Sequence, residues 1–245
     1  MPAGGKEFTG YVTFTHPADL FLTLLKQRLE LKNVSVTGSV RTMPANVKAD
    51  PSQITITQLE SPPFSTIAAQ TMKPSQNMFT ETILWTLGEN IGRQTSSTAD
   101  SSTLGLNVVK EWTKQIGISN NAVIQYDGSG MSRRDQVTPA SIVSLYTYMA
   151  KQSKYKQAWQ DSLTVGGVDG TLKRRFIGTT AEGNIRGKTG TLDQVSALSG
   201  YLTTAGGEQI VISAIVNGVP ELRTRTALID DIVVQLSNFN GKIDP

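Results

Sequence analysis

The stretch IRGKTGTLDQVSALSGYLTTAGGEQIVISAIVN, residues 185–217, decides the fold class. Apolar and polar residues alternate in three of its segments, 185–191, 195–203 and 209–217, and each alternation predicts a β-strand. The last two strands are separated only by Ala205-Gly206-Gly207-Glu208, which is typical of a hairpin connection. The stretch therefore predicts an antiparallel meander.

Helical spacing dominates the chain on both sides of this meander. Apolar residues three or four apart predict helices after Pro17, over 75–91, over about 104–116 and from Thr138 to Met149. A terminal amphipathic helix carries Ile229, Ile232, Val233 and Leu236, and residues 54–59 alternate as a further strand. In the helix over 75–91 we expect an inward face made of Met78, Phe79, Ile83, Leu87 and Ile91. Helices in the middle and a meander near the end indicate an α+β fold rather than alternating βαβ units.

Composition excludes several classes of protein. Of 245 residues 38% are hydrophobic and 18% charged, which favours a folded core over disorder. No apolar stretch is long enough to span a membrane. No apolar run follows Met1, so we expect no signal peptide in this chain. The net charge of +3, from 23 basic and 20 acidic residues, is too small to indicate binding to nucleic acid.

The chain contains no cysteine and a single histidine, His16. The missing cysteines exclude disulfides, thiol catalysis and cysteine-based zinc sites. Pro17 follows His16 directly, as is typical of a residue at the entry to a helix. Serine chemistry in this chain would therefore use a lysine, rather than a histidine, as its base.

Three segments could carry chemistry: Lys73-Pro74-Ser75-Gln76-Asn77, residues 127–133 and Gly187-Lys188-Thr189-Gly190-Thr191. Taken alone, Ser75 is an ordinary candidate for the cap of the helix that follows it. The segment 127–133 is best interpreted as a structural turn, since neither Ser129 nor Ser132 has the glycine spacing of a nucleophile elbow.

The Gly-Lys-Thr triplet at residues 187–189 also ends phosphate-binding loops. The leading glycine of such a loop would fall on Glu182, and a strand rather than a helix follows the triplet, which argues against nucleotide binding. A lysine, two hydroxyls and permissive glycines on one strand suit a substrate carboxylate instead.

Two triplets, in this order, resemble known signatures. Ser75-Gln76-Asn77 resembles SxN, and Lys188-Thr189-Gly190, 113 residues after Ser75, resembles KTG of the penicillin-recognising serine DD-peptidases. Residues 127–132 and 167–172 are similar to the family's segments between these signatures. Over residues 8–240 the chain is most similar to the D-Ala-D-Ala carboxypeptidase/endopeptidase family, the class C low-molecular-mass penicillin-binding proteins. The resemblance implies the family's α+β transpeptidase-like fold, with Lys188 at the rim of the sheet and within hydrogen-bond range, or one water, of Ser75.

The family's first signature, SxxK, has no counterpart before Ser75. It carries the nucleophilic serine and its lysine base, and the single Ser-x-x-Lys here is Ser153-Lys154-Tyr155-Lys156, in a polar run. A working SxxK lysine needs burial to lower its pKa. We therefore expect residues 1–245 to be the C-terminal part of the catalytic domain, without the SxxK part and the family's inserted domains.

The resemblance implies three catalytic residues. Ser75 would relay a proton towards the leaving amine, and Asn77 would hydrogen-bond the substrate amide. Lys188 would supply positive charge near Ser75 and near the substrate carboxylate. No metal or cofactor takes part in this chemistry.

It also implies a substrate-binding strand made of Thr189, Gly190 and Thr191. The two threonine hydroxyls would bind the substrate carboxylate, and Gly190 would leave room beside them. The backbone N–H of Thr191 would be one donor of the oxyanion hole.

The implied function is that of a serine-type D-Ala-D-Ala carboxypeptidase/endopeptidase. It would cleave peptidoglycan stem peptides ending in D-Ala-D-Ala through an acyl-enzyme, and β-lactams would acylate the same serine. The chain would supply SxN and KTG but not the nucleophile, so we expect it to be inactive without an SxxK-bearing segment or chain, in a periplasmic or otherwise extracytoplasmic location. The alternative is a catalytically inactive penicillin-binding-like module that binds a peptide or a partner.

Overall fold

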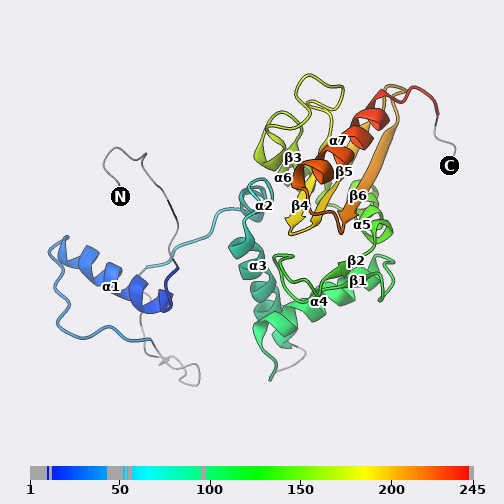
Figure 1. The fold of residues 1–245 in the computed structure, drawn as a ribbon. Helices are drawn as coiled ribbons and strands as arrows, with labels where there is room; N and C mark the ends of the chain where they lie inside the picture. Colours follow the sequence, from blue (N-terminus) through cyan, green and yellow to red (C-terminus); the bar gives the residue numbers. More distant parts are fainter. Residues whose placement is uncertain are drawn as a thin grey trace, which may run out of the picture. The chain divides into compact units, whose positions relative to one another are not determined.

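A computed structural model describes residues 10, 13–42, 52, 54, 57–94 and 98–242 of the chain (Figure 1). The chain divides into two units, Met1–Glu60 and Ser61–Pro245. The first contains α1 (Pro17–Glu30), which begins after His16 as predicted and has no buried residue. The predicted strand over 54–59 is absent at residues 54 and 57–59, and its remaining positions lie outside the described residues.

The second unit contains a helical part and a sheet. The helical part comprises α2 (Phe64–Met72), α3 (Asn77–Asn90), the 3-10 turn η1 (Gly92–Gln94), α4 (Ser101–Gln115), α5 (Pro139–Lys151) and α6 (Lys156–Ser162). A small ribbon pairs β1 (Val123–Ile124) with β2 (Gln136–Val137). The main sheet comprises β3 (Thr164–Val165), β4 (Arg186–Leu192), β5 (Val195–Thr203) and β6 (Gln209–Asn217); η2 (Gly170–Leu172) lies between β3 and β4, and α7 (Leu222–Asn238) follows β6.

The main sheet is antiparallel with the strand order β3-β4-β5-β6, so the predicted meander is confirmed. Lys188 of β4 lies opposite Ser199 of β5. The two-residue strand β3 pairs only with Arg186 and Gly187. Within the part of the chain that the structure describes, the other side of β4 is therefore an open sheet edge from Lys188 onwards.

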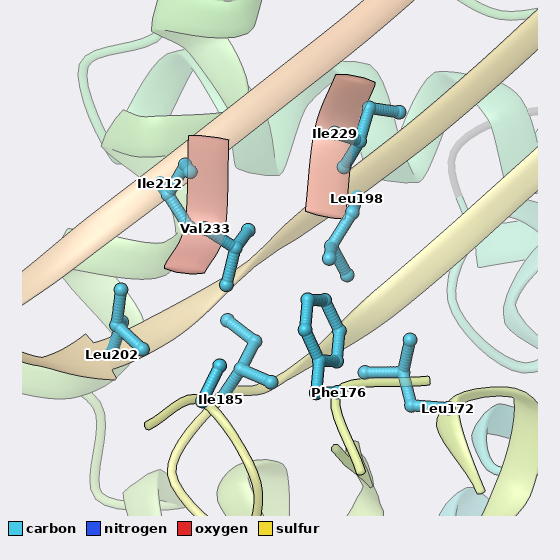
Figure 2. Packing of buried hydrophobic residues seen from close by; sticks show 9 residues of the cluster. Leu172, Phe176, Ile185, Leu198, Leu202, Ile212, Ile229 and Val233 are labelled. Atoms are coloured by element: carbon cyan, nitrogen blue, oxygen red, sulfur yellow. The ribbon is translucent and has the colours of Figure 1, made fainter. Parts of the chain in front are cut away.

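The apolar core forms between α7 and one face of this sheet (Figure 2). Ile229 and Val233 of α7 are fully buried with Leu198 and Ile185, as the spacing of the terminal helix predicts. Burying a side chain of this size stabilises the fold by about 1.5–3 kcal/mol. The cluster holds β5 and β6 against α7, and β4 pairs with β5 along its whole length.

The opposite face of the sheet lies against α5. Tyr201 of β5 donates its hydroxyl hydrogen to the Tyr146 carbonyl at 2.7 Å, and Trp159 of α6 donates to the Tyr201 hydroxyl at 3.0 Å. Side chains alternate between the faces of a strand, so Tyr201 and Ser199 share this face. Because Lys188 is paired with Ser199, Lys188 also lies on the side of the helical part.

The predicted inward face of α3 is wrong for three of its five residues, whereas Ile83 and Leu87 are half-buried. Helix α3 packs on α4 through the buried residues Leu84 and Gly88. The helices approach so closely that a Cβ added to Gly88 would lie 2.0 Å from the Ser101 carbonyl oxygen. Because of this contact, the face of α3 that carries Leu84 and Gly88 is buried instead of the expected one. Three expected core residues remain exposed: Met78 at 72%, Phe79 at 39% and Ile91 at 50%.

Candidate active site

Ser75 lies in the turn that joins α2 to α3, and its backbone is strained. Its φ of +59° lies in the left-handed region, which costs a residue with a Cβ about 1–2 kcal/mol. The cap position of α3 belongs to Gln76 and shows no side-chain capping bond, so Ser75 is not the ordinary helix cap that its sequence context suggests. Its hydroxyl is directed to another partner.

That partner is Lys188. The Lys188 Nζ donates hydrogen bonds to Ser75 Oγ and to the Thr189 carbonyl, both at 2.7 Å. The contact expected between Ser75 and Lys188 is thus present, although 113 residues separate them. Burial lowers the pKa of Lys188 to about 8, so the ammonium is still largely protonated at neutral pH.

Asn77 is the first residue of α3, two positions after Ser75, and is exposed. Its carbonyl accepts a hydrogen bond from the Thr80 hydroxyl at 2.7 Å, which belongs to the first turn of the helix. A contact of Asn77 with substrate remains a prediction.

The strand residues after Lys188 present different environments. The Thr189 hydroxyl donates to Thr171 Oγ1 at 2.7 Å, whereas Gly190 and Thr191 are exposed at the sheet edge. A Cβ added to Gly190 would meet only the Ala197 Cβ, at an ordinary 3.7 Å. Packing therefore does not require glycine here, and the residue keeps the strand surface open to a ligand.

Residues 127–132 form the structural turn that the sequence predicts. The Asp127 carboxylate accepts backbone N–H groups from Gly130 at 2.5 Å and from Ser132 at 2.6 Å. Glu81 of α3 accepts those of Gly128 and Ser129 at 3.0 and 2.9 Å. The turn is thereby attached to the helix that begins at the candidate site.

The segment Ser153-Lys154-Tyr155-Lys156 is open to solvent. Lys154 and Lys156 are exposed, and Tyr155 is 63% exposed. The Ser153 hydroxyl accepts a hydrogen bond from the Tyr155 N–H at 3.1 Å. The burial that an SxxK lysine needs is missing, in agreement with the polar sequence.

Sequence reasoning missed one cluster beside Ser75. Lys73 forms an ion pair with Asp169, and the Lys73 carbonyl accepts the Thr171 N–H at 3.1 Å. Residues 167–172 stand out in the sequence only through their resemblance to a family segment. No local spacing indicates a contact between residues 96 positions apart.

Among the residues whose placement is described, no group of three or more His, Asp or Glu side chains could hold a metal ion. No helix in the same part of the chain is long and apolar enough to cross a membrane.

The antiparallel sheet with its helical part has the fold of penicillin-binding proteins, a class of serine hydrolases, as the solved structures described below show. The chain belongs to the D-Ala-D-Ala carboxypeptidase 3 (S13) family, whose profile matches residues 1–238.

Known relatives agree with this assignment. The chain is 34% identical, over 251 aligned positions, to the D-alanyl-D-alanine carboxypeptidase of Actinomadura sp. (strain R39). The alignment covers 100% of this chain and 45% of that protein, so the chain spans less than half the length of this relative.

Solved structures share the fold. Penicillin-binding protein 4 of Haemophilus influenzae, complexed with a β-lactam, matches with a TM-score of 0.59 and 27% identity over 70% of this chain and 40% of that one. A penicillin G-acylated endopeptidase of Bdellovibrio bacteriovorus, in complex with an immunity protein, matches with a TM-score of 0.57 and 18% identity over 91% of this chain and 60% of that one.

Proposed function

We propose that the chain is the SxN- and KTG-bearing part of a serine-type D-Ala-D-Ala carboxypeptidase/endopeptidase. Its substrates are peptidoglycan stem peptides that end in D-Ala-D-Ala, its inhibitors are β-lactams, and its place of action is extracytoplasmic. The observation that carries the proposal is the 2.7 Å hydrogen bond from Lys188 Nζ to Ser75 Oγ. It joins the two signature triplets in one site.

In this proposal an SxxK serine attacks the carbonyl carbon of the penultimate D-alanine and forms an acyl-enzyme. Ser75 passes a proton to the departing amine, and water then releases the acyl group. Lys188 holds the Ser75 hydroxyl and contributes a cation for the terminal carboxylate of the substrate. Asn77 orients the substrate amide.

The open edge of β4 supports the proposed mode of substrate binding. The exposed Gly190 and Thr191 leave room for an extended peptide beside the strand. Main-chain hydrogen bonds from an exposed edge strand bind a peptide without regard to its side chains. The Thr191 N–H would face the carbonyl oxygen under attack, and the Thr189 and Thr191 hydroxyls would face the carboxylate.

The nucleophile comes from an SxxK-bearing segment or chain outside these 245 residues. An apolar groove of about 1510 Å³ supports this step. It is lined mainly by residues of α2, α3 and α5, among them Phe64, Phe79 and Tyr148, and it also includes Trp112 of α4 and Trp159 of α6. Met78 and Phe79 line the groove and directly follow Asn77, so part of the groove lies close to the Ser75 turn.

The second candidate is a catalytically inactive module that binds a peptide or a partner. One observation favours it: no Ser-x-x-Lys precedes Ser75 in the chain. Such a module would bind a peptide ending in D-Ala-D-Ala without forming an acyl-enzyme, whatever segment is added to it.

Labelling with a fluorescent penicillin separates the two candidates. The chain would be tested alone and after co-expression with the SxxK-bearing part of a family member, with intact-mass analysis and an assay for D-alanine release. We expect no adduct on the chain alone and a stoichiometric adduct on the SxxK serine when both parts are present. Lys188→Ala should slow this acylation by roughly 100-fold or more, as expected for loss of a stabilising charge.

Two results would contradict the proposal. An adduct on a residue of this chain alone, with Ser153 the first to examine, would show that the nucleophile is already present. The absence of any adduct from a correctly assembled pair would favour the binding module.

A further inference from the structure

Residues 164–172 form a bracket between the Ser75 turn and strand β4. The bracket begins with β3, which pairs Thr164 with Gly187 of β4. It ends with η2, where Thr171 Oγ1 accepts the Thr189 hydroxyl hydrogen at 2.7 Å. The bracket therefore holds both neighbours of Lys188 in the strand.

The other side of the bracket holds Lys73 through its side chain. Lys73 Nζ and the Asp169 carboxylate form an ion pair, with 27% and 35% of these side chains exposed. The second oxygen of Asp169 accepts the Val165 N–H at 2.8 Å. Partial burial raises the pKa of Asp169, but the hydrogen bonds from Lys73 and Val165 outweigh it, so the net shift is downwards and the carboxylate is ionised at neutral pH.

The backbone of Lys73 is held as well. Its carbonyl accepts the Thr171 N–H at 3.1 Å. Gly170, with φ +51°, packs directly against it, because an added Cβ would lie 2.5 Å from that carbonyl oxygen. Lys73 thus has two separate attachments to the bracket, and it precedes the strained Ser75 by two residues.

A left-handed backbone at a residue other than glycine persists only where the surroundings impose it. We propose that the bracket, acting through the Lys73–Asp169 ion pair, positions Ser75 so that its hydroxyl faces Lys188. Asp169 and Lys73 are then positioning residues for the reaction. This inference rests on the proposed function, because it assigns these residues to that site.

The test is an NMR titration of Lys188 in the full 245-residue chain, labelled in its lysine side chains and assigned with Lys188→Arg. In the unaltered chain the burial of Lys188 lowers its pKa to about 8. With Lys73→Met or Asp169→Asn the Ser75 turn is released and water reaches the amine. We expect the Lys188 pKa to rise by about 1 or more towards its ordinary value near 10.4.

Two variants serve as controls. Lys73→Arg retains the charge and the ion pair, so it should restore the low pKa of Lys188. Asp230→Asn breaks the partly buried Arg175–Asp230 pair, whose atoms lie 2.5 Å apart outside the site, so it should leave that pKa unchanged. Thermal unfolding of each variant confirms that the chain is folded during the titration.

The outcomes separate this inference from the function on which it rests. A low Lys188 pKa that stays the same in Lys73→Met and Asp169→Asn would overturn the bracket proposal alone. An ordinary pKa near 10.4 in the unaltered chain would overturn the buried site itself. A rise in Asp230→Asn as large as in Asp169→Asn would show general loosening and would also overturn the bracket proposal.

Discussion

Lys188 is a partly buried cation at the centre of the candidate site, and its position has an energetic cost. Burial lowers its pKa to about 8 because the protein hydrates the ammonium less well than water does. The hydrogen bonds to Ser75 and to the Thr189 carbonyl offset part of this cost. In the proposed function this partly desolvated charge would face the substrate carboxylate.

The protonation of Lys188 predicts how stability depends on pH. Its folded-state pKa of about 8 is below the unfolded value near 10.4, so below pH 8 both states are protonated and the full cost of burial is present. Between these values the unfolded state binds more protons, and stability rises with pH. Lys188→Met removes this effect.

Between pH 7 and pH 10.5 the unaltered chain should therefore gain about 2–3 kcal/mol of stability that Lys188→Met does not gain. Chemical denaturation of both proteins at each pH measures this change in their difference. A difference between the two proteins that does not change with pH would contradict the burial of the charged amine.

The backbone of Ser75 predicts an unusual order of stability among its variants. Ser75→Ala and Ser75→Gly both remove the hydroxyl that accepts the Lys188 hydrogen bond. Only glycine adopts a φ of +59° without steric cost, so Ser75→Gly should be more stable than Ser75→Ala by about 1 kcal/mol. Urea denaturation measures the difference, and a more stable alanine variant would show that the turn is not left-handed.

At the scale of elements, β4 serves two purposes along its length. Its first residues are tightly packed, since a Cβ on Gly187 would lie 2.4 Å from the Ser199 carbonyl oxygen. Further along, the surface over Gly190 is open. The strand is thus closely packed at Gly187 and open at Gly190, where we propose that a ligand binds.

Alanine at these two glycines tests that division. Gly187→Ala must displace the backbone of β5 and should destabilise the chain by about 2–4 kcal/mol. Gly190→Ala should change its stability by less than about 0.5 kcal/mol, because the new methyl group meets only Ala197. Thermal unfolding compares the two variants.

In the proposed assembly with an SxxK-bearing part, Gly190→Ala should weaken β-lactam acylation, because the methyl group would occupy the surface proposed for the ligand. Unchanged acylation would indicate that ligands do not approach this part of β4.

At the scale of the whole molecule, the second unit has a well-packed side and an open side. The sheet and α7 enclose the core, whereas the groove between the helices leaves Phe64 and Met78 largely exposed. Exposed apolar surface of this extent is typical of a binding site for another segment or chain.

A pair of matched substitutions tests the groove. Met78→Gln and Leu228→Gln both replace exposed apolar residues, 72% and 49% exposed, and only Met78 lines the groove. Both should change the stability of the chain by about 0.5 kcal/mol or less. Met78→Gln alone should weaken assembly with the SxxK-bearing part, measured by calorimetric titration. Equal effects of the two variants would place the partner elsewhere.

The sequence by itself determined the features that depend on local patterns. Alternation over residues 195–203 and 209–217 specified the meander, because successive side chains of a strand point to opposite faces. The terminal helix was equally evident, since Ile229 and Val233 recur at helical spacing and both reach the core. The signature triplets brought Ser75 and Lys188 into consideration, although each triplet is common when taken alone.

Tertiary structure alone decided which helix faces are covered and how Ser75 is held. The spacing of Met78 and Phe79 marks an apolar face but does not say which neighbour will approach, and the glycine contact between α3 and α4 buried a different face. The left-handed turn at Ser75 and its attachment to Asp169 through Lys73 join parts of the chain about a hundred residues apart. The periodicity of a sequence reflects the geometry of one helix or strand. Contacts between residues about a hundred positions apart depend instead on how the helices and strands pack on one another.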